Sequence, residues 1–291
     1  MGDFQTSSLI DDEKLSARAD KPLSALPRPF LRWAGSKRHL LPYLVDVLPK
    51  RFGTYREPFL GSGSLFFLLQ PHVASLSDSC EALIDTYGAV REGVVNVMSH
   101  LKQWKPDKKL YYAIRENMSE GRFKRAAEFI YLNKTCWNGL YRVNSDGKFN
   151  VPFGLPKSDA IADPNNLRAC SALLRQPGIR LFCDDFDAAL ESASQGDLVF
   201  LDPPYVTSHS NNGFLEYNEA IFSWSDQQRL ARVAKTLLMR GVHVIVTNAD
   251  HKPIRDLYRG FDIKRIKRPS TLASDKAKRR IVSELIFHSA R

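Results

Sequence analysis

The stretch of sequence that decides the fold is Leu198-Val199-Phe200-Leu201-Asp202-Pro203-Pro204-Tyr205. Its four apolar residues follow a turn at Gly196 and end abruptly at an acid and two prolines. A short apolar run bounded by turn residues is typical of a buried strand in a parallel sheet. Ligands of open α/β sheets bind beyond the carboxyl ends of such strands. We therefore expect an α/β fold in which Asp202 and Tyr205 lie beside the functional site.

The loop after this strand has the chemistry of a pocket for a flat ring that bears an amino group. Its two prolines lack N–H donors, so carbonyl oxygens are the exposed polar groups of the loop. The Asp202 carboxylate can accept one amino proton, a proline carbonyl can accept the other, and Tyr205 can stack on the ring. Adenine and cytosine both fit this description. An ordinary strand that ends in a proline-rich turn is the other interpretation.

The composition of the 291 residues is that of a globular protein with a large core. Hydrophobic residues make up 43% of the chain, and no apolar run approaches the roughly 18 residues that a membrane span needs. Residues 1–27 are polar, which predicts a disordered leader rather than a secretory signal. The four cysteines are far apart, and the seven histidines show no ligand spacing, so we expect a reduced protein without a metal.

Positive charge is concentrated in two regions of a chain whose net charge is +10. Residues 264–280 hold eight Lys or Arg against one Asp, and residues 101–160 hold twelve against six acids. Concentrated positive charge is typical of proteins that bind nucleic acid. A solvated surface can have the same composition, so charge alone leaves both interpretations open.

Two loop–helix segments are expected in the first hundred residues. The first is a loop and a helix, and the second is a strand, a glycine turn and a helix. Residues 38–48 place leucines on one helical stripe, with Ser36 as the candidate N-cap. Farther on, Gly61 and Gly63 follow an expected strand, and the next strand ends at Asp78, 21 residues after Glu57. Dinucleotide folds place an acid on a ribose hydroxyl at about this distance. The third glycine of a pyrophosphate site is missing, so a nucleoside without phosphates, or a plain turn, fits as well.

Residues 80–132 have a helical pattern with no strand after residue 87, which predicts an insertion into the sheet-forming domain. Two tight turns follow, at Asn138-Gly139 and at Ser145-Asp146-Gly147. The second predicts a hairpin tip before residues 148–151. Aromatic residues, asparagines and arginines gather there, as a base-reading loop requires. A structural hairpin that packs its aromatic residues is the alternative.

The sheet is predicted to resume after the insertion. The expected elements are a strand at 179–183, a helix at 225–239 capped by Ser225 or Asp226, a strand at 242–248, and an antiparallel pair at 262–267 and 280–287 joined by a basic loop. The polar loop at 207–223 is longer than usual βα connections, and such loops beside active sites are often lids or substrate clamps.

Four motifs, taken in order, resemble the N6-adenine DNA methyltransferases of the group typified by the bacterial Dam enzyme. They are Arg32-Trp33-Ala34-Gly35-Ser36-Lys37, Glu57-Pro58-Phe59-Leu60-Gly61-Ser62-Gly63, the expected recognition hairpin, and Asp202-Pro203-Pro204-Tyr205. The similarity runs from about Phe30 to Phe287. It implies a Rossmann-like S-adenosylmethionine-dependent methyltransferase sheet with an inserted, mainly helical DNA-recognition domain plus a β-hairpin. The catalytic domain would comprise residues 28–86 and 166–291, and the recognition domain residues 87–165.

The resemblance implies S-adenosylmethionine as the methyl donor and no metal. The residues that it assigns to the cofactor are Trp33, Lys37, Glu57, Pro58, Phe59, Gly61, Gly63, Asp78, Asp185 and Phe186. Asp78 would bind the ribose hydroxyls, and Asp185 with Phe186 would hold the adenine of the cofactor. The adjacent Asp184 fits the role of Asp185 equally well.

The resemblance assigns catalysis to Asp202, Pro203, Pro204 and Tyr205. The target adenine has to be flipped out of the duplex to reach such a pocket. Hydrogen bonds from its amino group to Asp202 and to the Pro203 carbonyl would draw the nitrogen lone pair out of conjugation with the ring. Tyr205 would hold the base by stacking.

The residues that the resemblance assigns to double-stranded DNA are Arg32, Trp137, Asn138, Leu140, Arg142, Asn144 and Pro152. Trp137 would fill the gap that the flipped base leaves. Arg32 and Arg142 suit O6 and N7 of guanine, which makes GATC the expected recognition site. The segment Gly154-Leu155-Pro156-Lys157 departs from the family pattern and leaves the specificity open.

Other activities stay open beside this one. RNA and protein-glutamine methyltransferases have related catalytic loops, but these typically begin with Asn rather than with Asp202. A DNA-binding regulator without catalytic activity is a third possibility, against which the intact Asp202, Tyr205 and glycine motif speak. We expect a cytoplasmic, nucleoid-associated protein of bacterial or phage type, solitary or paired with a restriction enzyme, whose oligomeric state the sequence does not indicate.

Overall fold

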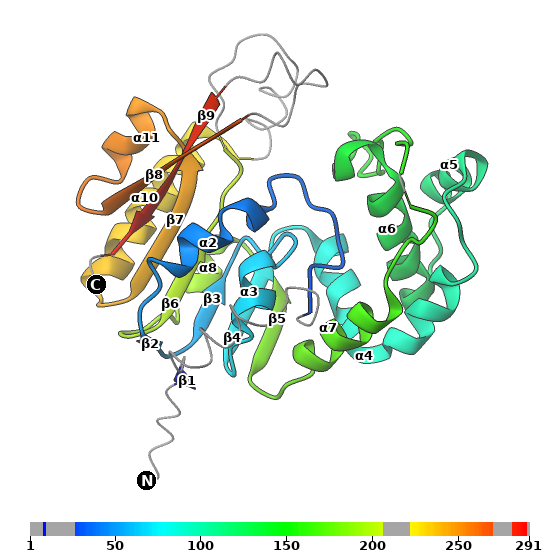
Figure 1. Ribbon diagram of the computed structural model, residues 1–291, viewed down its shortest axis with the longest axis horizontal. Helices are drawn as coiled ribbons and strands as arrows, with labels where there is room; N and C mark the ends of the chain where they lie inside the picture. Colours follow the sequence, from blue (N-terminus) through cyan, green and yellow to red (C-terminus); the bar gives the residue numbers. More distant parts are fainter. Residues whose placement is uncertain (1–7, 10–26, 157, 206–221, 270–280, 290–291) are drawn as a thin grey trace. The chain divides into compact units, whose positions relative to one another are not determined.

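The computed structural model describes residues 8–9, 27–156, 158–205, 222–269 and 281–289 (Figure 1). Most of the predicted leader, residues 206–221 of the long polar loop and residues 270–280 of the basic loop lie outside the described residues. Seven strands form a mixed sheet in the order β5-β4-β3-β6-β7-β9-β8. The predicted α/β class is therefore confirmed.

The chain divides into two compact units. One comprises Met1–Leu9, Tyr43–Phe59 and Asp185–Arg291, and the other comprises Ile10–Pro42 and Leu60–Asp184, of which the structure describes the residues given above. We refer to them as the Asp202 unit and the Asp78 unit, after the predicted site acid that each contains. The boundaries predicted for the catalytic and recognition domains remain a prediction.

The Asp78 unit pairs two parallel strands, β4 (Ala74–Asp78) and β5 (Ile179–Cys183), over their whole length. Its helices are α3 (Ser64–Leu69), α4 (Glu81–Leu101), α5 (Lys108–Glu116), α6 (Arg122–Thr135) and α7 (Pro164–Leu174), with 3-10 turns η2 (Lys37–His39) and η3 (Trp137–Gly139). Helix α4 packs against α6 and α7 (Figure 1). The helical block predicted from residue 80 onward is confirmed, and residues 87–132, all of them described, contain no strand.

The Asp202 unit is built around β6 (Leu198–Leu201), which runs parallel to β3 (Tyr55–Glu57) and to β7 (His243–Ala249). Strand β9 (Ile281–His288) is antiparallel to β7 and to β8 (Asp262–Pro269). The other elements are β1 (Ser8–Leu9), β2 (Arg51–Phe52), α8 (Phe186–Leu190), α10 (Trp224–Met239) and α11 (Lys252–Leu257). The buried strand and the final antiparallel pair are thus present as predicted, and β1, inside the predicted leader, pairs with β2.

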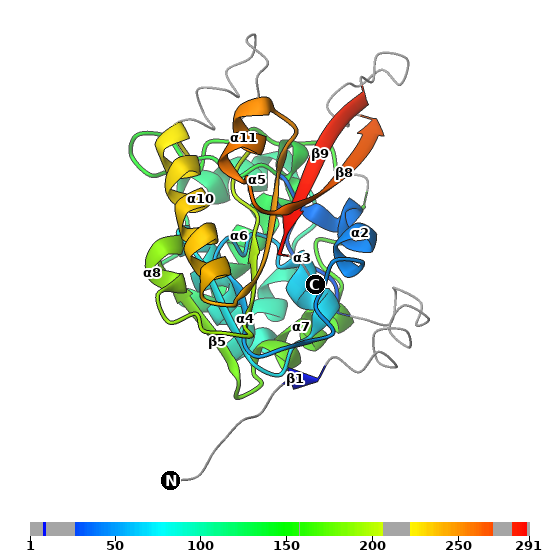
Figure 2. The same ribbon diagram turned by 90° about the vertical axis from the view of Figure 1, so that its left-hand side faces the viewer.

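The core of the Asp202 unit explains why β6 is apolar throughout. All four side chains of β6 are buried. Leu230, Ala234 and Leu237 recur along one face of α10 and belong to the same core cluster as Leu201 and Val246 of the sheet. Helix α10 therefore covers the sheet beside α8 and against β7 (Figure 2). This packing fixes the end of β6, and with it the position of the loop that begins at Asp202.

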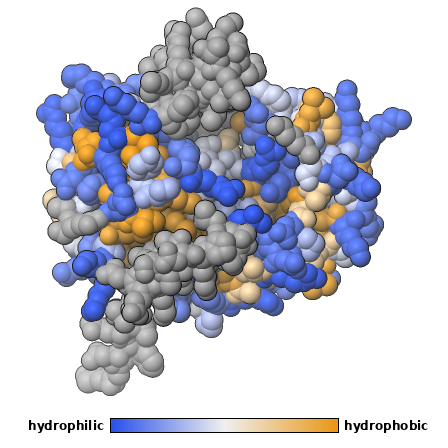
Figure 3. All heavy atoms as spheres, in the orientation of Figure 1, coloured by the Kyte–Doolittle hydropathy of each residue, from blue (hydrophilic) through white to orange (hydrophobic). Residues whose placement is uncertain are grey.

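Polar residues cover much of the face drawn in Figure 3, with smaller hydrophobic areas between them. Within the described ranges, no helix is long and apolar enough to cross a membrane. The described residues also contain no group of three or more His, Cys, Asp or Glu that could hold a metal ion.

The predicted helix at 38–48 is wrong in its length. The structure has the turn η2, then a five-residue helix α2 (Leu41–Val45). Pro42 lacks the N–H that a continuous helix through this point would need, and Pro49 disfavours helical backbone at the residue before it. Ser36 precedes η2, but its side chain makes no cap hydrogen bond and instead pairs with the hydroxyl of Ser64 at 2.9 Å.

Two further local predictions need correction. Helix α10 is capped by Ser223 rather than by Ser225 or Asp226, and Asp226 completes the capping box from the third helical position. In the predicted hairpin, the structure has isolated bridges at Val143–Phe149 and Cys136–Phe153 rather than two extended strands. The β-hairpin is therefore not established as a strand pair.

Candidate active site

The carboxylate of Asp202 is held from the side by a neighbouring strand. Because Leu201 of β6 pairs with Val246 of β7 in parallel register, Asp202 and Thr247 are the next residues on each strand. The Thr247 hydroxyl donates a hydrogen bond to Oδ1 of Asp202 at 2.5 Å. This contact orients one oxygen of the carboxylate, and a carboxylate oxygen can accept more than one hydrogen bond.

The two prolines differ in what their carbonyl oxygens contact. The Pro204 carbonyl accepts a hydrogen bond from Nε2 of Gln227 at 2.9 Å. Within the described part of the chain, no hydrogen-bond donor contacts the carbonyl of Pro203. The loop can therefore present two kinds of acceptor to an amino group: the carbonyl oxygen of Pro203 and the carboxylate of Asp202.

Tyr205 closes the predicted catalytic motif, and its hydroxyl is directed at a buried acid. The hydroxyl donates to Oε2 of Glu284, at a distance of 3.4 Å. Burial raises the pKa of Tyr205 well above its usual value, and the charges of Asp202 and Glu284 raise it further. Tyr205 therefore stays protonated, with its ring held at the edge of the loop.

Two aromatic residues of the predicted cofactor set pack together in the Asp202 unit. The rings of Phe59 and Phe186 are stacked, with 5.4 Å between their centroids. The guanidinium of Arg229 lies over the ring of Phe186, 4.2 Å from its centroid. Glu57 and Pro58, just before Phe59, are buried, and Glu57 accepts a hydrogen bond from the hydroxyl of Tyr55 at 2.9 Å.

Asp185 has a fixed carboxylate. It caps α8 by accepting from the backbone N–H of Asp187, and Arg229 donates to its two oxygens at 2.7 and 2.8 Å. Burial pushes the pKa of Asp185 up, but the hydrogen bonds and charge of Arg229 outweigh it, so the pKa lies below its usual value. Asp184 lies one residue earlier, at the end of β5, and is exposed.

The glycine turn of the Asp78 unit is arranged around the carboxylate of Asp78. Its Oδ2 accepts from the backbone N–H of Gly61 at 2.9 Å, and its Oδ1 accepts from that of Cys80 at 3.0 Å. Burial raises the pKa of Asp78, and the two N–H donors lower it only in part. Each oxygen keeps a lone pair for a further donor, as binding to two ribose hydroxyls would require.

Gly61 and Gly63 both have positive φ, at 46° and 64°, which side chains with a Cβ rarely adopt. A Cβ on Gly61 would lie 2.8 Å from the ring of Trp33, so the two motifs are in close contact. Gly63 is packed against Phe67 and the hydroxyl of Tyr87. Lys37 is buried, and its ammonium donates to the Gly35 carbonyl at 2.7 Å.

Trp33 also contacts the predicted DNA-reading segment. Its ring is stacked on that of Tyr141 at 5.4 Å and on that of Phe129 at 6.4 Å. Arg32, its neighbour, is held by Asn133 of α6 through both its backbone N–H and its carbonyl. Gly139 lies so close that a Cβ there would be 2.8 Å from the Cβ of Arg32. The first motif is thus packed between the glycine turn and the reading segment.

The predicted DNA contacts share one segment after α6, apart from Arg32. Trp137 is 46% exposed, and Asn138 has a positive φ of 54°. Nε of Arg142 donates to Oδ1 of Asn150 at 2.7 Å. Asn144 accepts from two backbone N–H groups of its own turn. Leu140 is partly exposed, and Pro152 is exposed and accepts from the backbone N–H of Trp137 at 3.0 Å.

The structure therefore groups the predicted residues into two sets. The Asp78 unit contains Arg32, Trp33, Lys37, Gly61, Gly63, Asp78, Trp137, Asn138, Leu140, Arg142, Asn144 and Pro152. The Asp202 unit contains Glu57, Pro58, Phe59, Asp185, Phe186, Asp202, Pro203, Pro204 and Tyr205. In the Asp78 unit, the contacts above join Gly61, Trp33 and the segment after α6. In the Asp202 unit, they join Phe59, Phe186 and Asp185 into one group and hold the Asp202 loop separately.

The sequence profile of the D12 class N6 adenine-specific DNA methyltransferases matches residues 33–272. The chain belongs to this family. It is 34% identical to the type II methyltransferase M1.LlaDCHI of Lactococcus lactis, over 89% of this chain and 94% of that protein. It is 35% identical to the type II methyltransferase M.MjaIII of Methanocaldococcus jannaschii, over 90% and 99%, and 32% identical to the DNA adenine methylase of Haemophilus influenzae, over 89% and 92%.

Family membership confirms that the chain is an adenine-specific DNA methyltransferase, as the four motifs predicted. It favours this activity over the RNA and protein-glutamine alternatives. The relatives come from bacteria, an archaeon and a phage, and some are type II methyltransferases. The residues assigned to each role remain predictions.

Sequence reasoning missed the residues that hold the predicted ones. Asn133, Gln227, Thr247 and Glu284 contact Arg32, Pro204, Asp202 and Tyr205, respectively. One signal was available: Thr247 and Asn248 follow an apolar run, as Asp202 does, and so lie at the carboxyl end of a predicted strand. Gln227 and Glu284 had no such signal.

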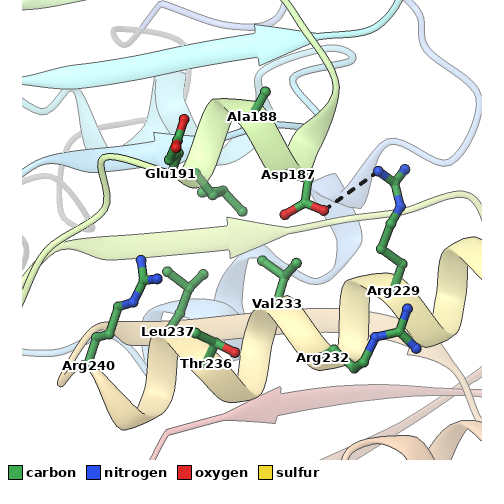
Figure 4. Close-up of a pocket in the computed structure, with 10 residues that line it drawn as sticks. Asp187, Ala188, Glu191, Arg229, Arg232, Val233, Thr236, Leu237 and Arg240 are labelled. Atoms are coloured by element: carbon green, nitrogen blue, oxygen red, sulfur yellow. Dashed lines mark ion pairs between the residues drawn. The ribbon is translucent and has the colours of Figure 1, made fainter.

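A pocket of about 560 Å³ lies between α8 and α10. Asp187, Glu191, Arg229, Arg232 and Arg240 line it, and Figure 4 shows Asp187 paired with Arg229 across it. None of the residues predicted for catalysis lines this pocket. We therefore leave it out of the candidate active site.

Proposed function

We propose that this D12-class enzyme transfers a methyl group from S-adenosylmethionine to N6 of a flipped adenine in double-stranded DNA, within the sequence GATC. The observation that carries the proposal is the Asp202 loop at the end of β6. Its carboxylate is oriented by Thr247, and the Pro204 carbonyl is tied to Gln227, while that of Pro203 has no donor among the described residues.

The amino group of adenine is a poor nucleophile, because its lone pair is delocalised into the ring. In the proposed mechanism the amino group donates one hydrogen bond to Asp202 and one to the Pro203 carbonyl. The new N–C bond would form as the S–C bond of the donor breaks, and the nitrogen would then lose one N–H proton to solvent. Two acceptors at fixed positions favour a pyramidal nitrogen whose lone pair points away from the ring plane. The rate enhancement would come mainly from positioning and from electrostatics organised in advance.

Each unit contains side chains that are chemically suited to S-adenosylmethionine, which would supply a methyl group on a positively charged sulfur. Asp78 has lone pairs for ribose hydroxyls, and its neighbour Gly61 allows close approach because it has no side chain. In the other unit, Phe59 and Phe186 offer an aromatic surface, and Asp185 a fixed acceptor. We propose Trp33, Lys37, Glu57, Pro58 and Gly63 as further cofactor contacts.

DNA reading is proposed for Arg32 and for the segment after α6. Trp137 is a large exposed aromatic, as insertion into the gap of a flipped base requires. Arg32 and Arg142 would read guanine, and Asn138, Leu140, Asn144 and Pro152 would contact the duplex around them. The GATC assignment rests on the resemblance of these positions to the Dam group.

The test is methylation of unmethylated plasmid DNA by the full chain and S-adenosylmethionine, followed by long-read mapping of modified bases. We expect N6-methyladenine confined to GATC. Methylation confined to another short motif would overturn the GATC assignment and retain the reaction. Cofactor binding without any methylation of DNA would overturn the proposed reaction.

The matched variant for this test is Asp202→Asn, which keeps the size of the side chain and removes its charge. We expect a large loss of turnover with unchanged DNA affinity, since the carboxylate is proposed to act on the amino group alone. Turnover close to that of the wild type would contradict the role of Asp202.

A further inference from the structure

Four polar side chains are buried beneath the Asp202 loop: Gln227, Thr247, Asn248 and Glu284. The first three have no exposed surface, and Glu284 is 4% exposed. Buried polar groups are costly unless they are hydrogen-bonded, so each is expected to have a specific partner. Their partners divide them into two kinds.

Gln227 and Asn248 hold the backbone of the loop. Asn248 donates to Oε1 of Gln227 at 3.0 Å, and Gln227 donates to the Pro204 carbonyl at 2.9 Å. This arrangement fixes where the loop runs. Among the described residues, neither Gln227 nor Asn248 forms a hydrogen bond with the side chain of Asp202 or Tyr205.

Thr247 and Glu284, in contrast, contact the side chains of the loop. The Thr247 hydroxyl donates to Oδ1 of Asp202 at 2.5 Å. Glu284 accepts from the Tyr205 hydroxyl at 3.4 Å. Each hydroxyl has one proton to donate: that of Thr247 is donated to Asp202, and that of Tyr205 to Glu284.

The sheet register explains how these two residues reach the loop. Thr247 follows Val246, the partner of Leu201, and so lies beside Asp202. Glu284 of β9 pairs with Ala249 of β7 and lies on the strand next to Thr247. Both anchors are therefore on sheet strands, which hold a side chain more precisely than a loop can.

We propose that Thr247 and Glu284 are positioning residues for methyl transfer. Thr247 orients the Asp202 carboxylate toward the amino group, and Glu284 holds the Tyr205 hydroxyl, so that the ring presents a fixed stacking face. The proposal rests on the proposed function, because it concerns the same site. It assigns a role in the reaction to two residues outside the four predicted for catalysis.

Thr247→Val tests the first anchor, because it keeps the shape of the side chain and removes the hydroxyl. We expect kcat to fall by about 10- to 100-fold, the range that loss of a hydrogen bond to a charged group gives. The KM for DNA and the Kd for S-adenosylhomocysteine should change by less than about threefold, since the hydrogen bond acts on the reacting group. Thr247→Ser should restore most of kcat.

The matched control is Thr86→Val. Thr86 is also buried, and its hydroxyl donates to the Ala82 carbonyl inside α4. We expect this variant to keep the kcat of the wild type. A wild-type kcat in Thr247→Val, or an equal loss in Thr247→Val and Thr247→Ser, would overturn the positioning role of Thr247.

Tyr205→Phe and Glu284→Gln, alone and combined, test the second anchor. If Glu284 acts through the hydroxyl, Glu284→Gln should lower kcat in the wild-type background and change nothing further once Tyr205 is Phe. Fluorescent 2-aminopurine in place of the target adenine should report a change in stacking for Glu284→Gln in the wild-type background, and no further change once Tyr205 is Phe. Effects that multiply in the double variant would overturn the role of Glu284.

These outcomes can be told apart from failure of the proposed function. If the wild type does not methylate DNA, the reaction itself is wrong, whatever the variants do. If the wild type methylates DNA and both anchors can be changed without loss, only the positioning role is wrong. Thermal unfolding of each variant identifies any that lose activity because they unfold, and for Thr247 the Ser variant then decides.

Discussion

Asn133 holds the backbone of Arg32 with both halves of its side-chain amide. Its Oδ1 accepts from the Arg32 N–H at 2.7 Å, and its Nδ2 donates to the Arg32 carbonyl at 2.5 Å. Asn166 makes the same two hydrogen bonds to Arg28, both at 2.8 Å. The two asparagines can therefore be compared directly: they make the same contacts, but only Asn133 holds a residue that is predicted to read DNA.

Asn133→Ala is expected to weaken both stability and sequence discrimination. It leaves the N–H and carbonyl of Arg32 unpaired, which should cost roughly 2–3 kcal/mol of unfolding free energy. A loosened Arg32 should also lower the preference for the cognate site over a site with one changed base by about tenfold. Asn166→Ala should cost similar stability without this loss of preference, measured by urea unfolding and by methylation of the two duplexes. Equal losses of preference would contradict the role of Arg32.

Gly61→Ala is expected to reduce cofactor binding more than stability alone explains. The left-handed backbone costs Ala about 1–2 kcal/mol, and its Cβ would also clash with the ring of Trp33. Gly196→Ala is the control, since Gly196 has φ of 83° but open space around it. Calorimetric titration with S-adenosylhomocysteine should detect a loss of affinity only for the Gly61 variant. The same affinity in both variants would argue against Gly61 as a cofactor residue.

The ion pair of Asp185 and Arg229 predicts a pH dependence of stability. Because the pKa of Asp185 is lowered in the folded state, its contribution is present above the unfolded-state pKa and is lost as the pH falls through the folded-state pKa. Both side chains are substantially exposed, so the contribution should be at most about 1 kcal/mol. Urea unfolding between about pH 6 and pH 3 should therefore show the difference between wild type and Arg229→Gln shrinking in acid.

Arg232→Gln is the control for this measurement, as it lies on the same helix and has no ion pair among the described residues. We expect its stability to follow that of the wild type across the same pH range. A constant difference between wild type and Arg229→Gln at all pH values would show that Arg229 acts through packing on Phe186 instead.

Lys134 predicts a pH dependence of DNA binding. Its pKa is lowered to about 8 by burial and by the charges of Arg32 and Arg38. Lys134 lies at the end of α6, just before the predicted DNA-reading segment that begins at Trp137. A DNA phosphate beside it would favour the charged form, so the DNA affinity of the wild type should fall as the pH rises from about 7 to about 9. Lys134→Arg should remove most of this fall, since arginine stays charged. Fluorescence anisotropy at constant salt measures both, and an identical fall in the variant would exclude Lys134 as its source.

The sequence by itself determined the α/β class, the order of the motifs and the family. The apolar run at 198–201 and the acid after it could be recognised because a buried strand and a proline-rich exit are local properties of the chain. The cap of α10 and the length of the helix near residue 40 were predicted less well. Both depend on which of several neighbouring residues sets the helix boundary: Pro42 interrupts the first helix, and Ser223 rather than Ser225 caps α10.

The tertiary structure alone decided how the site residues are held. Asn133 lies 101 residues from Arg32, and Glu284 lies 79 residues from Tyr205, so no local pattern links them. Strand register brings Thr247 to Asp202, and the packing of aromatic rings brings Tyr141 to Trp33. Such contacts arise because buried polar and aromatic groups have to find partners in the folded chain, whatever their separation in sequence.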